Sequence, residues 1–423
     1  MHYIRLLRPA KIQDSAGGLV ISLLLTITTD LGDSFLCPGD GPLDLVVGVV
    51  GTALDSVGSA AARRQACRYQ WKTGMRVLDA KVKLSPGVKR ETLNCRFAIY
   101  PARQQQPREA STPLGALRIG DVLPWRVDAD GTPQMGVVMP ATFEFTNGVC
   151  ASVSVRTLGL GTGPVVGDNP GNGELNLQFE EDIGESIARH IWDAGVVASA
   201  YLADACTLLG NIRELLPIKH RGFNVLELGS GVGILGITIA SILPKAAAAQ
   251  GQTLANAKVL LTDLEEAEER ARSNIERWNV GRASATLAPE ATAVADVTVA
   301  YENLDWDEGC EGRFGPLAAA MPWDLVVLSD CTYNVDSLPA LVGTLGALHT
   351  LKERHYHDSH ETPVKSSVLL ATKPRHSSEE ALFGLLKDQS WSYRIAAEIP
   401  LPKIGEEDEV VQVYFLEKGG PRI

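Results

Sequence analysis

The sequence predicts an α/β domain built on a mainly parallel sheet, preceded by a β-rich domain. Beyond residue 175, strand-like apolar runs alternate with segments of helical periodicity, a pattern typical of a parallel sheet covered by helices on both faces. The last two strand-like runs have no helix between them, which predicts an antiparallel finish. Before residue 170, short apolar runs are separated by Gly and Pro, without a helical period. A chain of 423 residues can hold two such domains.

The N-terminal half is expected to consist of strands. Gly18–Thr28 is almost wholly apolar, and Ala141–Phe145 (ATFEF) alternates with a period of two. Similar runs cover Met75–Leu84, Leu93–Tyr100 and Cys150–Leu158. Because Arg and Lys precede the first run, a signal peptide is an alternative to a buried strand there. The run is too short to span a membrane, and Asp30 follows it without a small-residue cleavage site, so a strand is favoured.

A segment rich in glycine marks a boundary between the two halves. Residues 159–173 read GLGTGPVVGDNPGNG, a composition typical of a linker or a long surface loop. We therefore predict a β-rich N-terminal domain over residues 1–170, with a candidate role in substrate docking. The α/β domain is predicted over residues 171–423.

The α/β domain is expected to begin with a helical segment within Ile183–Leu209. Strands are then predicted at Asn224–Leu228, Lys258–Thr262, Val297–Tyr301, Leu325–Ser329, Ser367–Thr372, Trp391–Ile399 and Val410–Glu417. Helices are predicted at Val232–Leu243, Glu265–Trp278, Val335–Leu351 and Ser378–Lys387. Three segments interrupt this alternation and are predicted to be surface loops, which lengthen at small thermodynamic cost: Pro244–Ala257, Arg282–Asp296 and Glu353–Lys365.

The first strand of this domain runs directly into a glycine turn. Val225–Gly233 (VLELGSGVG) carries Gly229, Gly231 and Gly233 at alternate positions. Glycine allows the backbone to pass close to a ligand and to adopt conformations that other residues avoid. The helix that follows points its positive N-terminus at such a ligand, and open α/β sheets bind ligands at this edge. The turn is therefore a candidate cofactor site.

Three features bear on which class of cofactor this turn binds. Gly231–Gly236 (GVGILG) also fits the dinucleotide fingerprint, so a nicotinamide or flavin cofactor is an alternative. However, Glu227 would repel a pyrophosphate, whereas it can hold the amino group of S-adenosylmethionine (SAM). Asp263 ends the next strand and can accept hydrogen bonds from both ribose hydroxyls, a feature shared with NAD proteins. The antiparallel finish, which NAD domains do not require, also favours SAM.

Charge and cysteine content narrow the class of protein. A formal net charge of −12 and a pI near 5.2 argue against a protein whose main affinity is for the nucleic acid backbone. Seven cysteines without a C-x-x-C pair favour neither a disulfide framework nor a zinc site. His355, His357 and His360 lie in a polar stretch without cysteine partners, so a solvated loop is expected rather than a metal site. A cytoplasmic location is expected, with the nucleus as a second candidate.

Four motifs together resemble the class I (seven-β-strand) SAM-dependent methyltransferases. They are LELGSGVGILG at the glycine turn, TDL at Thr262–Leu264, LDW at Leu304–Trp306 and SDCTYN at Ser329–Asn334. The order Asp330-Cys-Thr-Tyr333 narrows the resemblance to the protein-lysine methyltransferases that carry an acidic-x-x-Tyr motif. The resemblance covers about residues 175–418 and implies a seven-stranded Rossmann-like methyltransferase sheet with an antiparallel last strand. The SDCTYN motif and the extra N-terminal half are most similar to fungal lysine methyltransferases that act on translation elongation factors.

The resemblance also implies a set of site residues. The residues expected to bind SAM are Trp192, Glu227, Gly229, Ser230, Gly231, Gly233, Asp263, Asp305, Trp306 and Asp330. The glycine turn would surround the amino acid part of SAM, Asp263 would hold the ribose, and Asp305 with Trp306 would flank the adenine. Trp192 would lie near the cofactor and substrate entrance. No metal is implied.

The acceptor pocket is expected to be lined by Asp330 and Tyr333, as the catalytic residues. Structural roles remain alternatives for four of the residues singled out. Trp192 could be core packing, and Trp306 could cap a strand end. Asp330 could cap the helix that begins near Asp336, and Tyr333 could be plain packing.

The sequence therefore predicts a SAM-dependent protein-lysine N-methyltransferase. The expected partner is a protein substrate, with an elongation factor as the candidate, and neither nucleic acid nor membrane; a monomer is expected. Nucleobase methylation is disfavoured because it usually goes with an Asn-Pro-Pro-aromatic motif, and here the tetrad is Asp-Cys-Thr-Tyr. Methylation of a small molecule or of another protein side chain is an alternative. A SAM-binding interaction protein without turnover and an NAD-dependent oxidoreductase also stay open.

Overall fold

The chain forms two compact units in the computed structural model. The structure describes residues 1–39, 41–52, 66–84, 86–102, 115–126, 138–161, 175–184, 187–207, 209–218, 222–286, 296–357, 365–402 and 408–419. The first unit comprises Met1–His190 with Leu401–Asp408, and the second comprises Ile191–Pro400 with Glu409–Ile423. The predicted boundary after residue 170 lies outside the described residues. The strand after it, β13 (Asn176–Asp182), pairs with β12 (Val153–Gly159) and so belongs to the first unit.

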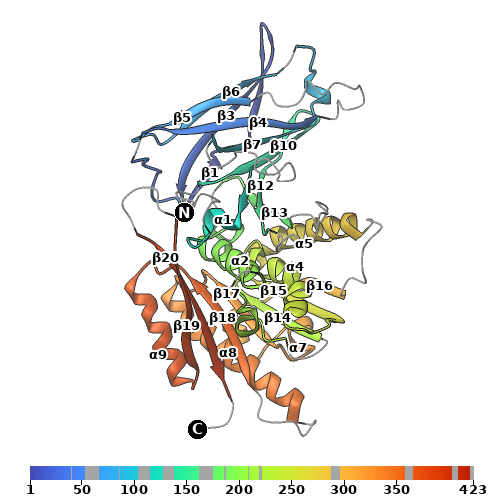
Figure 1. Ribbon diagram of the computed structural model, residues 1–423, viewed down its shortest axis with the longest axis vertical. Helices are drawn as coiled ribbons and strands as arrows, with labels where there is room; N and C mark the ends of the chain where they lie inside the picture. The colour runs from blue at the N-terminus through green and yellow to red at the C-terminus, as the bar shows by residue number, and fades with distance from the viewer. Residues whose placement is uncertain are drawn as a thin grey trace. The chain divides into compact units, whose positions relative to one another are not determined.

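The N-terminal unit contains two sheets (Figure 1). One sheet has the order β2-β3-β1-β9, with β6 also paired to β3, and the other has the order β13-β12-β10-β7-β4-β5, with β11 on β10 and β8 on β12. The remaining strands are β1 (His2–Leu6), β2 (Lys11–Ser15), β3 (Gly18–Thr29), β4 (Leu43–Thr52), β5 (Ala66–Trp71), β6 (Leu78–Lys83), β7 (Cys95–Pro101), β8 (Ala116–Arg118), β9 (Val138–Met139), β10 (Ala141–Thr146) and β11 (Val149–Cys150). Its helical turns are η2 (Arg90–Thr92), α1 (Ile119–Val122) and η4 (Ile187–Arg189). This confirms a β-rich N-terminal region.

Strand β3 occupies an interior position in its sheet. It pairs with β1, β2 and β6, and its alternate residues Leu19, Ile21, Leu23, Leu25 and Ile27 are buried in the core of the unit. This apolar run is therefore a buried strand, as expected, because its large side chains fill one face of a sheet.

Within the described ranges, the structure contains no helix long and apolar enough to cross a membrane.

The C-terminal unit is built on a seven-stranded sheet of order β16-β15-β14-β17-β18-β20-β19. The strands are β14 (Gly222–Leu228), β15 (Asn256–Asp263), β16 (Asp296–Asn303), β17 (Leu325–Ser329), β18 (Ser366–Thr372), β19 (Ser392–Pro400) and β20 (Val410–Lys418). All pairs are parallel except those that β20 makes with β18 and β19. This confirms the predicted sheet with an antiparallel last strand.

Helices cover both faces of this sheet (Figure 1). The helices are α2 (Asp193–Ala205), α3 (Ile212–Leu215), α4 (Ile234–Ala249), α5 (Glu265–Thr286), α6 (Trp306–Gly309), α7 (Pro316–Ala319), η5 (Val335–Ser337), α8 (Leu338–His357), η6 (Ser377–Glu380) and α9 (Ala381–Asp388). Helices α4 and α5 contact β15 and β16, while α8 and α9 pack in a second cluster that includes Leu226 and Leu228 of β14. Because side chains alternate along a strand, Val225 and Glu227 face the layer of α4.

The predictions of three surface loops were partly wrong. Helix α4 continues through Pro244 to Ala249, because the alanines that follow are strong helix formers and Ala246 and Ala247 are buried. Helix α5 continues to Thr286, and α8 continues to His357. His355 and His357 therefore lie in a helix rather than in a loop. His360 and the rest of these two segments, residues 287–295 and 358–364, lie outside the described residues.

Candidate cofactor and acceptor site

The glycine turn adopts a backbone that requires glycine. Gly229, Gly231 and Gly233 have φ of 66°, 52° and 83°, in the left-handed region that other residues rarely adopt. A Cβ on Gly229 would lie 3.0 Å from Cys331 Cβ and 3.3 Å from the Trp306 ring. The turn therefore joins β14 to α4 while its backbone lies closely against neighbouring segments. Gly233 is the N-cap residue of α4, so the positive end of this helix faces the turn.

Glu227 lies under this turn as a buried carboxyl with one oxygen engaged. Its Oε2 accepts a 2.9 Å hydrogen bond from the Gly236 backbone N–H. Its Oε1 and the Ser230 hydroxyl are buried and have no hydrogen-bond partner within the described residues. Burial, opposed by the Gly236 bond and aided by the charge of Asp263, raises the pKa of Glu227 to about 8. An ammonium group such as that of SAM would donate hydrogen bonds to Glu227 Oε1 and to the Ser230 hydroxyl oxygen, and its charge would favour the ionised form of Glu227. These residues therefore fit the predicted ligand.

Asp263 connects the second strand to the same turn. Its Oδ2 accepts a 2.7 Å hydrogen bond from Gly231 N–H, and its Oδ1 accepts one of 2.7 Å from Leu264 N–H. Burial raises its pKa, although both backbone donors favour the charged form. Because each carboxylate oxygen can accept two hydrogen bonds, Asp263 retains capacity for ribose hydroxyls while it positions Gly231.

Trp306 and Asp305 follow the third strand and differ in their contacts. The Trp306 ring is half-buried beside Gly229, and its carbonyl accepts a 3.1 Å hydrogen bond from Thr344 Oγ1. The exposed Asp305 side chain instead caps α6, accepting a 2.9 Å hydrogen bond from Asp307 N–H. The structure thus brings Trp306 to the glycine turn, whereas the described contact of the Asp305 side chain lies within its own helix.

Asp330 joins three segments that are distant in sequence. It follows β17 with a φ of 51°, and it is 8% exposed. Its Oδ2 accepts a 2.7 Å hydrogen bond from Ala194 N–H at the start of α2. Its Oδ1 accepts one of 3.1 Å from Lys373 N–H after β18. The alternative in which Asp330 caps the helix near Asp336 is wrong, because Asn334 makes that cap.

Trp192 and Arg375 lie next to Asp330. Trp192 is the half-buried N-cap residue of α2, and the Arg375 guanidinium lies 5.3 Å from the centre of its ring. Arg375 Nη2 is also 3.7 Å from Asp330 Oδ1. Arg375 is not among the site residues expected from the sequence. The sequence shows that Arg375 follows β18 closely, but only the folded sheet shows that β18 neighbours β17, the strand that precedes Asp330.

Tyr333 lies at the rim of this region with 54% of its surface exposed, so it is not plain core packing. Burial of the remainder, together with the charges of Asp263 and Glu266, raises the pKa of its hydroxyl. The preceding Thr332 Oγ1 lies 2.9 Å from Thr372 Oγ1 and donates a 3.1 Å hydrogen bond to Glu379. The loop that carries Asp330 and Tyr333 is therefore anchored to the loop after β18.

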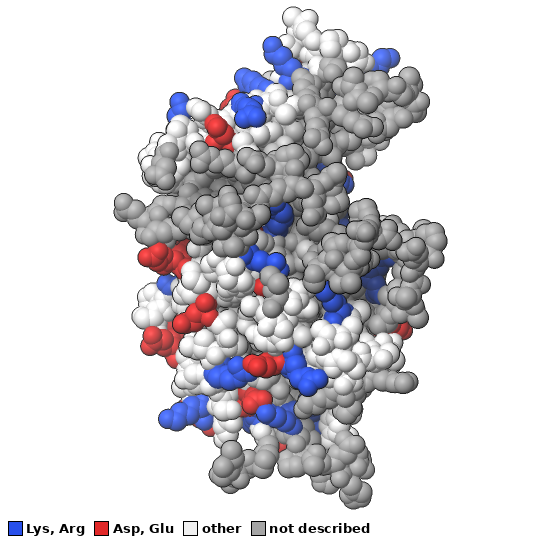
Figure 2. All heavy atoms as spheres, viewed as in Figure 1, with Lys and Arg blue, Asp and Glu red and all other residues white. Residues whose placement is uncertain are grey.

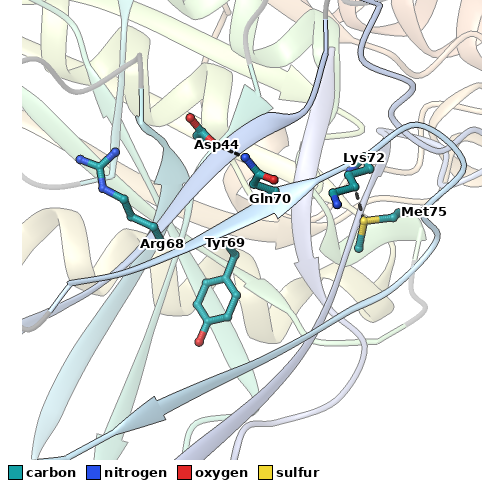
Figure 3. Close-up of a pocket in the computed structure, with 6 residues that line it drawn as sticks. All are labelled: Asp44, Arg68, Tyr69, Gln70, Lys72 and Met75. Carbon is teal, nitrogen blue, oxygen red and sulfur yellow. Dashed lines mark hydrogen bonds between the residues drawn. The ribbon is translucent and has the colours of Figure 1, made fainter.

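A hollow of about 550 Å³ lies on the N-terminal unit (Figure 3). It is lined by Asp44, Arg68, Tyr69, Gln70, Lys72 and Met75. Asp44 accepts a 3.1 Å hydrogen bond from Gln70, and the Lys72 backbone N–H lies 3.1 Å from Met75 Sδ. Two cationic side chains at an open hollow can contact acidic groups, but this set lacks the nucleophile and base pairing of a catalytic centre.

Charged side chains of both signs are interspersed among the described residues of one face of the molecule. On the face drawn in Figure 2, Lys and Arg lie beside Asp and Glu rather than forming one broad basic area. Within the described residues, no group of three or more His, Cys, Asp or Glu side chains is placed to hold a metal ion.

Comparisons with known proteins agree with this geometry. A family model described as lysine methyltransferase matches residues 172–389, which is 218 of the 423 residues. The protein N-lysine methyltransferase METTL21A of Mus musculus is 28% identical over 214 residues, covering 50% of this chain and 73% of the relative. The protein-lysine N-methyltransferase EFM6 of Saccharomyces cerevisiae is 28% identical over 220 residues, covering 50% and 74%.

A further relative is named without an activity. The UPF0665 family protein C23C4.06c of Schizosaccharomyces pombe is 29% identical over 242 residues, covering 57% of this chain and 56% of the relative's length. Among solved structures, Pyrococcus horikoshii TYW2 in complex with MeSAdo aligns with a TM-score of 0.32 and 12% identity, over 63% of this chain and 71% of that chain.

Proposed function

Because this chain belongs to the lysine methyltransferase family, we propose that it transfers the methyl group of SAM to the ε-amine of a lysine in a protein. The family match confirms the resemblance predicted from the sequence. The observation that supports the activity is that two segments, one suited to the cofactor and one to the acceptor, lie together at one edge of the sheet. One is the glycine turn over the buried carboxyl of Glu227, of which one oxygen has no described partner. The other is the Asp330 loop, in which Cys331 Cβ would lie 3.0 Å from a Cβ added to Gly229.

The residues of the turn would hold the methyl donor. Glu227 and Ser230 would bind its ammonium group, Asp263 its ribose, and Trp306 would pack beside its adenine. Bound SAM supplies a methyl group on a positively charged sulfur, ready for in-line displacement by an amine. The protein's task is alignment of nitrogen with that carbon, which needs little covalent chemistry of its own.

The acceptor lysine must lose a proton before it can react. With an ordinary pKa of about 10.4, removing that proton at pH 7 costs roughly 4–5 kcal/mol. Burial of the lysine beside a positive sulfur lowers this cost. Asp330 would attract and orient the amine, and Tyr333 at the rim would hydrogen-bond it or present its ring to the cationic product.

We propose an elongation factor as the substrate protein, on the strength of the SDCTYN motif, with the reaction taking place in the cytoplasm. Radiolabelled SAM added to an extract of cells that lack this protein tests both activity and substrate. Purified protein should label one lysine-containing band, which mass spectrometry then identifies. Label confined to small molecules would support the small-molecule alternative. Binding of SAM without any label would support an interaction protein.

The N-terminal unit is proposed to dock the protein substrate. Its support is the exposed hollow with Arg68 and Lys72, which can bind acidic side chains at the surface of a partner. Replacing Arg68 and Lys72 together by Glu should raise KM for the labelled protein and leave SAM affinity unchanged. The matched control replaces Lys11 and Lys83, which are exposed on other strands of the unit, by Glu. Equal KM for the two double variants would refute docking at the hollow.

A further inference from the structure

Three segments meet around the carboxylate of Asp330. The start of α2 donates the Ala194 N–H to Oδ2, and the segment after β18 donates the Lys373 N–H to Oδ1. Both oxygens thus bind backbone, which fixes the position of the carboxylate. Arg375 adds a full positive charge, with Nη2 3.7 Å from Oδ1 and only 13% of its side chain exposed.

Arg375 is itself held in place from two sides. Its guanidinium lies 5.3 Å from the centre of the Trp192 ring, a cation–π distance. Its backbone N–H donates a 2.9 Å hydrogen bond to Glu379 Oε1, and Oε2 of the same carboxylate accepts a bond from Thr332. Glu379 therefore ties the Arg375 segment to the loop that carries Asp330.

The other charged groups near Asp330 have their own partners. Lys373 Nζ lies 2.9 Å from Asp193 Oδ2 and 2.5 Å from Glu409 Oε1. Asp263 and Glu227 lie on the cofactor side, where Asp263 binds the backbone of the glycine turn and Glu227 binds that of the first turn of α4. Among these described ion pairs, Asp330 is paired with Arg375, whereas Lys373 is paired with Asp193 and Glu409.

This arrangement has a consequence for the acceptor amine. An uncompensated carboxylate next to a lysine stabilises the charged ammonium, which cannot attack the methyl group. A guanidinium beside that carboxylate offsets its negative charge while its hydrogen bonds keep it in place. We propose that Arg375 is a positioning residue for methyl transfer: it lies over the Trp192 ring and offsets the charge of Asp330, so that the acceptor amine gives up its proton to water more readily. This inference rests on the proposed lysine methylation.

Its test compares Arg375→Ala and Arg375→Lys with wild type. The substrate is the protein that wild-type enzyme labels, and kcat and KM for this substrate are measured across pH. With Ala, the acid limb of kcat should move to higher pH by about one unit, so kcat at pH 7 should fall on the order of tenfold. The KM for the protein should not rise, because the carboxylate now attracts the ammonium more strongly. Lys should restore much of the rate by retaining the charge.

Arg394→Ala is the matched control, since Arg394 also lies over an aromatic ring, that of Phe415, but on the exposed edge strand β19. Calorimetry with S-adenosylhomocysteine should give the same affinity for wild type, both Arg375 variants and the control. A fall in kcat that is equal at every pH, or an unchanged kcat, would overturn the role of Arg375. Absence of lysine labelling by wild type would instead refute the proposed function, so the two failures are distinguishable.

Discussion

The backbone N–H of Gly236 donates a 2.9 Å hydrogen bond to Oε2 of Glu227, while Oε1 of the same carboxyl has no hydrogen-bond partner within the described part of the chain. A buried polar atom without a partner costs roughly 1–3 kcal/mol. Glu227 is fully buried at the end of β14, so water does not offset this cost. Such a carboxyl gains most from a ligand that brings a positively charged donor.

Ligand binding should therefore release a proton from Glu227. Its pKa is raised to about 8 in the ligand-free protein, so the carboxyl is mostly protonated at pH 7. The ammonium group of S-adenosylhomocysteine favours the carboxylate, and the proton leaves. Calorimetry in buffers of different ionisation enthalpy should detect close to one proton released at pH 7 and progressively fewer as the pH rises above 8. Glu227→Gln should abolish the release.

The same residue predicts a dependence of stability on pH. Because its pKa is raised from the ordinary 4.5, ionisation of Glu227 opposes folding. The protonated carboxyl therefore stabilises the folded state relative to the carboxylate. This stabilising contribution is fully present below pH 4.5 and is lost as the pH rises through about 8. The free energy of unfolding of ligand-free wild type should fall over this range relative to that of Glu227→Gln. Parallel pH profiles for the two proteins would contradict the raised pKa.

Gly229→Ala should weaken ligand binding. The substitution combines a φ of 66°, which strains any residue with a side chain, with a Cβ only 3.0 Å from Cys331 Cβ, so the turn or Cys331 must move. We expect the affinity for S-adenosylhomocysteine to fall at least tenfold in calorimetry. Gly281→Ala is the control, because Gly281 lies in α5 with no atom within 4 Å of an added Cβ. Near-native affinity in Gly229→Ala would show that the backbone of the turn does not contact the ligand.

The sequence predicted the sheet and its glycine turn because both depend on local patterns. Leu325–Ser329, for example, is a strand with the bounds expected from its apolar run. Pro244 misled the prediction, because a proline within a helix usually ends it. Here the Ala-rich continuation and the burial of Ala246 and Ala247 outweigh the lost hydrogen bond.

The surroundings of Asp330 could not be predicted in the same way. Ala194 and Lys373 donate their N–H groups to one carboxylate although they are 179 residues apart in sequence. No periodicity or spacing carries such information, because it depends on which strand ends are adjacent in the folded sheet. Arg375 was missed for the same reason, since its contacts with Trp192 and Asp330 arise only when those ends meet.

Tyr333 offers a test that separates its hydroxyl from its ring. Its raised pKa keeps the hydroxyl protonated at neutral pH, so it can donate a hydrogen bond but cannot act as a base. We expect Tyr333→Phe to lower kcat about tenfold, and Tyr333→Ala to lower it further because the ring is also lost. Tyr393→Phe is the control, since Tyr393 is also exposed but lies on β19. Full activity of Tyr333→Phe would assign the role to the ring alone.

Asp330 should respond differently to Ala and to Asn. Removing the carboxylate leaves the buried N–H groups of Ala194 and Lys373 without this acceptor, which costs roughly 1–3 kcal/mol each. Ala also fits poorly at a φ of 51°, whereas Asn tolerates the left-handed region and keeps one carbonyl oxygen. Denaturant unfolding should therefore show a clear loss of stability for Asp330→Ala and a smaller one for Asp330→Asn.

Methyl transfer should nevertheless be lost in both Asp330 variants, because neither retains the charge that attracts and orients the acceptor lysine. Affinity for S-adenosylhomocysteine in Asp330→Asn should stay within a few-fold of wild type, since the glycine turn and Glu227 are untouched. If Asp330→Asn methylates as fast as wild type, the carboxylate serves only to join α2, β17 and β18, and the acceptor must be oriented by other groups. If activity instead follows stability across both variants, Asp330 acts through the fold alone.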